Sequence, residues 1–255
     1  MQDLLHSSTA TGPGAAPLQP AALAFDLDGT LIDTRGSFSR IVKDLSGACD
    51  DELLRLRSTG GFNDDWDLAR GLTAWIKAGR PKIVERCDNL TDLLLWCGAD
   101  NDPGDLSADC RDRYRGDNGH PALCKSEPLL IDAESLEKLA DVVDVYACTG
   151  RDQWEFDRAE ELLGFVFARA TVAEHVRKPD PQALLRLLTP EQAPSVVVLV
   201  GDTHADRLTI KHARTRRPDL RFAFVFVDGA RTAKAFIDAV CNEGVEAAVA
   251  AFAEP

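Results

Sequence analysis

Short apolar runs alternate with segments that carry apolar residues at helical spacing through the second half of the chain. Runs rich in β-branched residues indicate buried strands, whereas an apolar period of three to four indicates an amphipathic helix. The predicted strands, one of them near the N-terminus, cover residues 21–25, 144–148, 195–200 and 221–227. The predicted helices cover residues 130–143, 153–163, 180–188, 206–214 and 231–240.

Alternation of this kind is typical of parallel strands joined by crossover helices. We therefore predict an α/β fold with a parallel sheet and helices on both faces. Residues that favour helix ends support the boundaries. Asp132 is a candidate N-cap, Gly164 suits a C-cap, and Asp180 before Pro181 indicates an N-cap with proline at the first helical position.

Residues 35–127 have a different pattern, with few strand-like runs. Helical spacing occurs in four segments, at residues 38–45, 51–56, 66–76 and 90–95. A polar stretch rich in Asp and Gly follows between residues 98 and 120. We expect an all-α cap over 35–127, inserted into an α/β core formed by 18–34 and 128–255. Residues 1–17 are rich in Ser, Thr, Gly, Pro and Ala, which predicts a disordered leader.

The formal charge of −13, from 42 acidic and 29 basic residues, repels nucleic acid and anionic membranes. No apolar run is long enough to span a bilayer. The first residues lack the basic and apolar regions of a secretory signal. The seven cysteines include no CxxC pair, which fits reduced thiols. We expect a cytoplasmic protein with no nucleic-acid or membrane partner.

The candidate chemistry begins with Asp26-Leu27-Asp28-Gly29-Thr30-Leu31, directly after the first predicted strand. Ligands of open α/β sheets bind at the carboxyl ends of the strands. Two carboxylates at such an end can converge on one cation. The structural alternative is an acidic turn, which Asp and Gly favour in any protein.

Three further motifs each follow a core segment. Thr149-Gly150-Arg151-Asp152 ends the second strand, and a hydroxyl with glycine amides can cradle a phosphate. Lys178 stands before a rigid Pro-Asp-Pro turn, near a helix start. Asp202 and Asp206, four residues apart after the next strand, suit a hard cation. Each motif taken alone has an alternative explanation. The Thr-Gly motif could be an ordinary turn, Lys178 a surface lysine, and the two aspartates an acidic helix start.

The order and spacing of these four motifs resemble the haloacid dehalogenase (HAD) superfamily. The resemblance covers the core and makes the insert look like a cap between the first and second motifs, as in subfamily I, over a Rossmann-like core. Dehalogenases of the superfamily lack the second aspartate of the DxD motif, so Asp28 favours phosphoryl chemistry. The implied protein is a Mg²⁺-dependent phosphatase that acts on a small phosphorylated metabolite through an aspartyl-phosphate.

The resemblance also assigns roles to the motif residues. Asp26 is the nucleophile, and Asp28 protonates the leaving oxygen and then activates water. Mg²⁺ ligands are Asp26, Asp202 and the Asp28 backbone carbonyl, while Asp206 holds a water on the ion or orients Lys178. Lys178 binds nucleophile and phosphate. The phosphoryl oxygens also contact Thr149 and Gly150. A phosphomutase of the same superfamily is the first alternative, and a non-catalytic binding protein with this fold is the second.

The cap contains a Gly-Gly pair followed by a polar and aromatic cluster that resembles a subgroup of capped phosphatases. We expect four of its residues to contact the substrate: Asn63, Asp64, Asp65 and Trp66. Arg151 is a further candidate, pairing either with substrate or with acids of the cap. The alternative is a helix start capped by Asn63 or Asp64, with Trp66 packed in a core.

Overall fold

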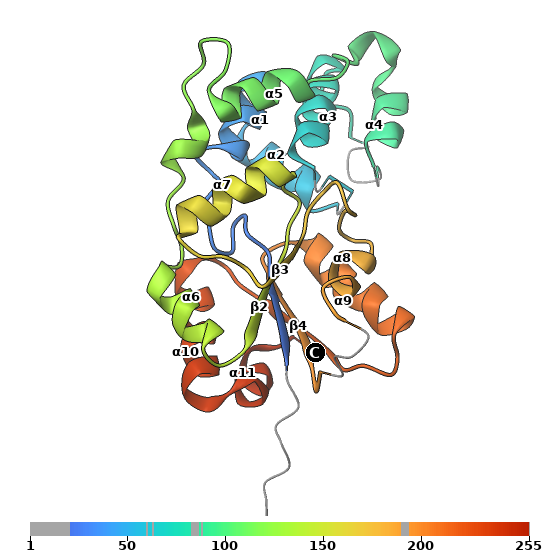
Figure 1. The fold of residues 1–255 in the computed structure, drawn as a ribbon. Helices are drawn as coiled ribbons and strands as arrows, with labels where there is room; N and C mark the ends of the chain where they lie inside the picture. Colours follow the sequence, from blue (N-terminus) through green and yellow to red (C-terminus); the bar gives the residue numbers. More distant parts are fainter. Residues whose placement is uncertain are drawn as a thin grey trace, which may run out of the picture.

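The computed structural model describes residues 21–59, 61, 62, 64–82, 87, 89–189 and 194–254. The leader predicted over 1–17 and the candidate Asn63 lie outside the described residues. Five parallel strands form one sheet in the order β3-β2-β1-β4-β5 (Figure 1). Their bounds are β1 Ala22–Phe25, β2 Asp144–Cys148, β3 Arg169–Thr171, β4 Val197–Gly201 and β5 Phe222–Phe226. The predicted parallel sheet is confirmed.

The strand β1 lies at the centre of the sheet, where Ala24 pairs with Tyr146 of β2 on one side and Leu199 of β4 on the other. Because all strands are parallel, their carboxyl ends meet at one edge of the sheet. The segments that follow β1, β2 and β4 are the ones that carry the acidic and Thr-Gly motifs. The topology therefore gathers residues that are up to 180 positions apart in sequence, such as Asp26 and Asp206.

Helices cover both faces of the sheet. Leu23 and Phe25 of β1 belong to an apolar cluster on one face, and Ala22 and Ala24 to a cluster on the other. The first face is covered by α6 Ala133–Ala140, α7 Gln153–Leu163, α10 Ala230–Glu243 and α11 Val245–Phe252. The second is covered by α8 Gln182–Leu185 and α9 His204–Arg216. A strand buried on both faces needs apolar residues at every position, which explains the uninterrupted apolar runs.

The predicted helix ends have mixed outcomes. Asp132 accepts a hydrogen bond from the Ser135 N–H at 2.8 Å, and Gly164 adopts a left-handed φ of 62° after α7. The helix predicted over 180–188 is wrong in length, because α8 has only four residues. The chain continues in tight turns closed by i→i−3 hydrogen bonds. Pro190 follows directly in the sequence, and a proline disfavours helix in the residue before it.

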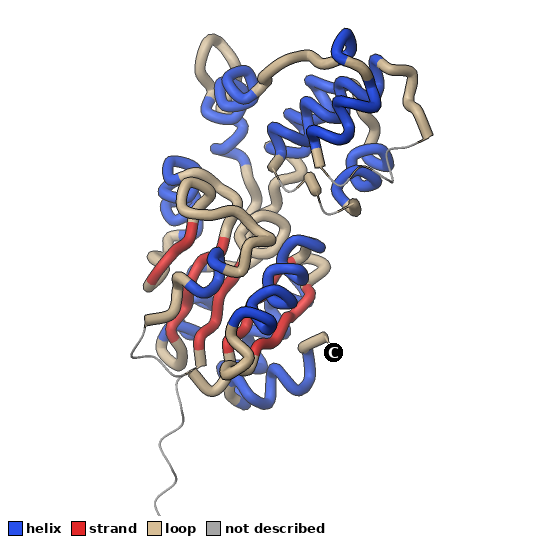
Figure 2. Tube along the Cα trace, turned by 90° about the vertical axis from the view of Figure 1, so that its right-hand side faces the viewer, coloured by secondary structure: helices blue, strands red, loops and turns tan. Residues whose placement is uncertain are grey.

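Within the described residues, five α-helices lie between β1 and α6 in the sequence and form what we call the helical block. They are α1 Phe38–Ser46, α2 Asp50–Arg57, α3 Asp65–Lys77, α4 Leu90–Cys97 and α5 Ser107–Arg115. They pack around an apolar cluster of their own, which includes Leu72 of α3 and Tyr114 of α5. In Figure 2 the strands lie below the helical block. No described helix is both long and apolar enough to cross a membrane.

The two chain segments that connect the helical block to the sheet run side by side. The Asp33 N–H donates to the Pro128 carbonyl at 2.8 Å, and the Leu130 N–H donates to the Leu31 carbonyl at 2.8 Å. Ile32 and Leu129 form an antiparallel bridge between these bonds. The entry and exit of the helical block are thus held together by backbone hydrogen bonds.

Two glycines follow α5. Both need a left-handed backbone, but only one of them also lacks space for a side chain. Gly116 and Gly119 both have left-handed φ, at 86° and 84°. A Cβ on Gly116 would lie 2.6 Å from the Ala122 Cβ, whereas a Cβ on Gly119 would have no atom within 4 Å. Either alanine substitution is expected to lose about 1–2 kcal/mol through the left-handed backbone.

We predict that Gly116→Ala lowers the free energy of unfolding by about 1–3 kcal/mol more than Gly119→Ala, because the Ala122 backbone has to move. Urea unfolding of the two variants beside the wild type measures this difference. Equal losses would contradict the steric reason.

Candidate active site

Asp26 follows β1 and is buried where the central strand ends. Its N–H donates to the Val200 carbonyl at 2.8 Å, so the backbone still pairs with β4. Its Oδ1 accepts the Leu27 N–H at 2.8 Å and lies 2.9 Å from Lys178 Nζ. The side chain is therefore fixed by its own turn and by one buried cation.

The turn after Asp26 requires glycine at position 29. Gly29 has a φ of 76°, and a Cβ there would lie 2.1 Å from Asp202 Oδ2. The Gly29 N–H donates to the Ile32 carbonyl at 2.8 Å, which closes the turn. The absence of a side chain allows the loop after β1 to contact the Asp202 carboxylate that follows β4.

The structure brings together the carboxylates of Asp26, Asp202 and Asp206, which we call the acidic cluster. One ligand oxygen from each lies within 4.8 Å of the others. Asp206 is oriented by the start of α9, where Thr203 donates its N–H at 3.0 Å and its hydroxyl at 2.5 Å to Oδ2. The other oxygen, Oδ1, accepts from Lys178 Nζ at 2.7 Å.

The acidic cluster has more negative than positive charge. Lys178 is the one cation among the described residues that forms ion pairs with the cluster, and it contacts Asp26 and Asp206. Burial raises the pKa of Asp202 to about 7, and repulsion from Asp206 adds to the effect. Burial also raises the pKa of Asp26, against the opposing charge of Lys178. Burial alone would lower the pKa of Lys178, but Asp206 and Asp26 outweigh it and raise that pKa.

The Thr-Gly motif lies at the end of β2. The buried Thr149 donates its N–H to the Thr171 carbonyl at 3.0 Å, and its Oγ1 accepts the Arg151 N–H at 3.1 Å. Gly150 lines the same cavity as Asp26 and Lys178. The motif therefore presents a glycine backbone beside the acidic cluster.

Arg151 is buried and contributes to the lining of this cavity. Its guanidinium donates two hydrogen bonds to Asp28 Oδ1, at 2.9 Å and 2.6 Å, and one to Glu127 Oε2 at 3.1 Å. Of the two expected partners, substrate or acids of the insert, the described contacts include Glu127, the last residue of the predicted insert. The Asp28 contact was not expected.

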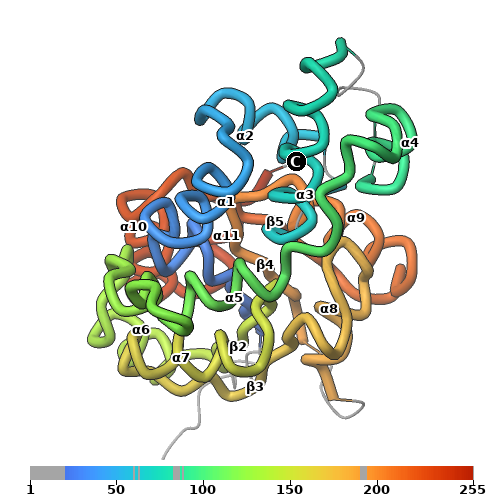
Figure 3. Tube along the Cα trace, turned by 90° about the horizontal axis from the view of Figure 1, so that it is seen from above, coloured from blue at the N-terminus to red at the C-terminus, as the bar shows by residue number. Residues whose placement is uncertain are grey.

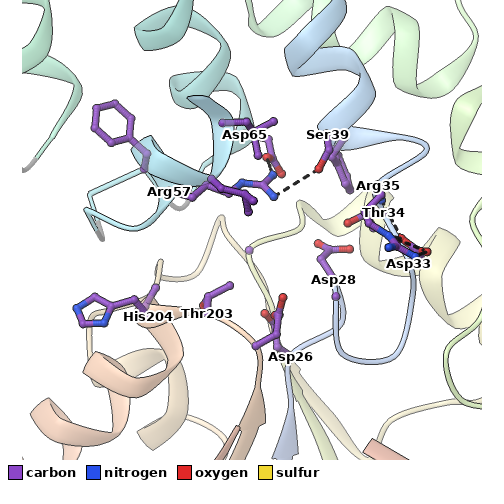
Figure 4. Close-up of a pocket in the computed structure, with 18 of the residues that line it drawn as sticks. Asp26, Asp28, Asp33, Thr34, Arg35, Ser39, Arg57, Asp65, Thr203 and His204 are labelled. Atoms are coloured by element: carbon purple, nitrogen blue, oxygen red, sulfur yellow. Dashed lines mark hydrogen bonds and ion pairs between the residues drawn. The ribbon is translucent and has the colours of Figure 1, made fainter. Parts of the chain in front are cut away.

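A cavity of about 920 Å³ extends from the strand ends to the helical block. Asp26 and Asp28 point into it from below, while Arg57 of α2 lies opposite them, between Asp65 and Ser39 (Figure 4). Viewed from the helical-block side, α1 and α3 lie in front of the sheet region (Figure 3). The cavity therefore has a carboxylate-rich floor and a wall made by helices.

Asp64, Asp65 and Trp66 line this cavity, as expected for substrate contacts. The alternative interpretation, a capped helix start with Trp66 packed in a core, also describes this segment. Asp64 caps α3 by accepting the N–H groups of Trp66 and Asp67 at 2.9 Å and 3.1 Å. The Trp66 ring lies 5.4 Å from that of Phe38, centroid to centroid. The helix start and the cavity wall are one and the same segment.

The sequence analysis missed three polar residues that the structure brings to this region. Arg57 forms an ion pair with Asp65 in the cavity wall. Glu127 and Tyr114 are buried together and form a 3.2 Å hydrogen bond. Glu127 and Tyr114 belong to segments without a recognisable motif, and only their burial identifies them.

Comparison with known proteins agrees with the fold. Residues 20–214 match the family model of haloacid dehalogenase-like hydrolases, and the chain belongs to this family. It is a HAD-superfamily hydrolase. No curated protein sequence gives a match.

Solved structures of similar fold include the phosphatase Tt82 from Thermococcus thioreducens. It shares 25% sequence identity, with a TM-score of 0.68 over 87% of this chain and 99% of that chain. The putative HAD-hydrolase YfnB from Bacillus subtilis shares 15% identity, with a TM-score of 0.49 over 87% and 99%. A putative beta-phosphoglucomutase from Thermotoga maritima shares 16% identity, with a TM-score of 0.43 over 82% and 86%.

A buried carboxyl beside the cavity gives the stability a pH dependence. Glu155 Oε2 accepts the Asp152 N–H at 2.9 Å, but Oε1 has no hydrogen-bond partner within the described part of the chain. Burial, with Asp152 as the second cause, raises the pKa of Glu155 to about 8. The folded state thus binds this proton more tightly than the unfolded state, where a Glu pKa is about 4.3.

We predict that the wild type loses on the order of a few kcal/mol of unfolding free energy from this group between about pH 5 and pH 8.5. Glu155→Gln removes the ionisation and should flatten the pH dependence. Urea unfolding at pH 5.5, 7 and 8.5 measures it, with the exposed Glu137→Gln as control. Identical pH slopes for the wild type and Glu155→Gln would refute the prediction.

Proposed function

We propose that the chain is a Mg²⁺-dependent phosphomonoesterase that acts on a small phosphorylated metabolite through an aspartyl-phosphate on Asp26. The observation that carries the proposal is the second carboxylate of the DxD motif. Asp28 faces the cavity that holds Asp26 and is fixed there by Arg151. A second carboxyl group beside the nucleophile supplies an acid for a leaving oxygen, which a halide leaving group does not need. The likeness to phosphatase Tt82 supports the same reading.

The residues present fit a divalent cation. The acidic cluster offers only oxygen ligands, which Mg²⁺ prefers. Among the described residues, these three carboxylates form ion pairs with one lysine only, so their fully ionised form carries a net charge of −2 that one divalent ion would balance. Asp26, Asp202 and Asp206 would hold the ion, with the Asp28 backbone carbonyl. When bound, the ion would neutralise charge on the carboxylates and on the phosphoryl oxygens.

The nucleophile has to approach an anion, and two unit charges at 4 Å repel by about 4 kcal/mol in a partly screened site. Lys178 lies 2.9 Å from the Asp26 carboxylate and can contact an incoming phosphoryl oxygen as well. Asp206 accepts a hydrogen bond from this lysine and is itself oriented by the Thr203 hydroxyl. The Thr149 hydroxyl and the Gly150 N–H are the proposed donors to the remaining oxygens.

In the proposed covalent steps, Asp28 gives up one proton and later takes one back. An Asp26 carboxylate oxygen attacks phosphorus, the ester P–O bond breaks, and the Asp28 carboxyl gives its proton to the leaving oxygen. In the second step Asp28 takes a proton from water, whose oxygen attacks the phosphoryl group and releases Asp26 and inorganic phosphate. Asp28 then carries its proton again for the next cycle.

We further propose that residues 35–127 act as a cap that excludes water and selects the leaving group. Within the described residues, every lysine and arginine that lines the cavity is already paired with a carboxylate. On the wall these pairs are Arg35–Asp33, Lys43–Asp50 and Arg57–Asp65. The wall has no surplus positive charge, which favours a polyol or amino-alcohol phosphate over a substrate with a second anionic group.

A panel of phosphorylated metabolites, assayed for inorganic phosphate release, tests the function. We predict release from polyol or amino-alcohol monophosphates, at higher kcat/KM than from phosphoglycolate and without any added bisphosphate. Asp26→Asn should abolish release, because an amide is a far weaker nucleophile. The control Asp33→Asn, which alters another cavity carboxylate, should remain active. Product isomerisation without phosphate release would indicate the phosphomutase instead, and Asp26→Asn activity within tenfold of wild type would exclude Asp26 as nucleophile.

Metal dependence is tested separately from catalysis. We predict that chelation abolishes turnover, that added Mg²⁺ restores it, and that Ca²⁺ inhibits because its larger, looser ligand shell misplaces Asp26. Isothermal titration of Asp26→Asn and Asp202→Asn with Mg²⁺ gives a readout independent of turnover. Binding should weaken most in Asp202→Asn. Full activity in excess chelator would refute the metal assignment.

A further inference from the structure

The guanidinium of Arg151 is buried, and all five of its N–H donors have an acceptor. Nε and one Nη2 hydrogen bind Asp28 Oδ1, and the other Nη2 hydrogen binds Glu127 Oε2. Nη1 donates to the Tyr114 hydroxyl at 3.0 Å and to the Glu155 backbone carbonyl at 3.2 Å. A fully satisfied, planar donor group of this kind holds its partners in one geometry.

The acceptors of Arg151 come from four segments of the chain. Asp28 belongs to the turn after β1, Glu155 to α7 beside the sheet, and Tyr114 to α5 of the helical block. Glu127 lies on the segment that leaves the helical block, and it also accepts the Ser37 hydroxyl at 2.5 Å from the segment that enters it. Both connections to the helical block therefore meet at the carboxylate that Arg151 binds.

Aromatic packing adds to these contacts between the sheet and the helical block, which we call the junction. The Phe38 ring, at the start of α1, stacks on the Tyr114 ring with centroids 4.4 Å apart and an interplanar angle of 15°. The Arg151 Cζ atom lies 5.4 Å from the Phe38 centroid. A movement of α1 or α5 away from the sheet would break hydrogen bonds of Arg151 or Glu127, or this stacking.

Both hydrogen bonds from Arg151 to Asp28 end on Oδ1, and no described residue donates to Oδ2. Oδ2 is thus the oxygen left to exchange a proton with a leaving group. We infer that Arg151 is a positioning residue that fixes the Asp28 carboxyl for proton transfer and couples this orientation to the docked position of the helical block. The inference rests on the proposed function, because it needs Asp28 to act as the acid.

Such a role has a signature that general destabilisation lacks. An alkyl phosphate has a poor leaving group and needs the acid, whereas p-nitrophenyl phosphate has a good one and needs it little. We expect Arg151→Lys to lower kcat/KM about 100-fold for an alkyl phosphate, within the range typical of general acid catalysis, and less than about fivefold for the aryl ester. Lysine keeps the charge but lacks the planar fork.

Two milder variants test the coupling while Asp28 and Arg151 themselves are kept. Tyr114→Phe and Glu127→Gln each weaken the junction on the helical-block side and keep the shape of the side chain. Both should lower kcat/KM for the alkyl phosphate about tenfold, and kcat/KM for the aryl ester by a smaller factor. These variants also carry the test if Arg151→Lys does not fold, which thermal unfolding followed by circular dichroism will show.

Arg115→Met is the matched control. Arg115 also bridges α5 and the segment after β2, through a 3.0 Å ion pair with Asp152, but it does not contact Asp28. Arg115→Met should lower kcat/KM for both esters by the same factor or leave both unchanged. An alkyl-specific loss in Arg115→Met would assign the effect to general loosening and overturn the inference.

Asp28→Asn separates the inference from the proposed function. Asp28→Asn should show the alkyl-specific loss itself, and the double variant with Arg151→Lys should be no worse than Asp28→Asn alone. An active wild type with parallel losses on both esters in Arg151→Lys overturns only the positioning role. A wild type that hydrolyses no phosphate ester overturns the proposed function, and the inference with it.

Discussion

The site depends on one buried ammonium group. Lys178 lies within hydrogen-bond distance of both Asp26 and Asp206. In the part of the chain that the structure describes, the third carboxylate, Asp202, forms no ion pair with a lysine or arginine. Loss of one partner from a buried ion pair typically destabilises a protein by about 3–5 kcal/mol. The lysine therefore makes it possible to bury acids that follow two different strands, and it leaves the excess negative charge that a divalent cation would balance.

The parallel sheet explains why these groups meet at all. Because β1, β2 and β4 run in the same direction, Asp26, Thr149 and Asp202 follow strand ends at one edge. The fold and this convergence could be predicted, since strands covered on both faces are continuously apolar and stand out from the sequence. The strand β3 could not, because Arg169–Thr171 is a short edge strand with an exposed arginine.

What the sequence could not indicate is the part of the site formed by Tyr114 of the helical block and by Glu127, which follows that block. The helix α5 buries only Cys110 and Tyr114, so its apolar signal is too weak to separate it from a polar loop. Glu127 follows no strand and matches no motif. Their proximity to Arg151 arises from packing between segments distant in sequence, which periodicity does not encode. Arg151 itself was singled out by its motif, but its buried contact with Asp28 depends on that packing.

The paired connections between sheet and helical block have a consequence for the evolution of the chain. The backbone bonds between Asp33 and Pro128, and between Leu31 and Leu130, bring the two segments that flank the helical block within bonding distance. Loop-closure entropy rises only slowly with the length of an inserted segment. A sheet with such a closed junction can exchange one insert for another, large or small, without rebuilding its strand ends. Specificity and chemistry can then diverge as separate modules.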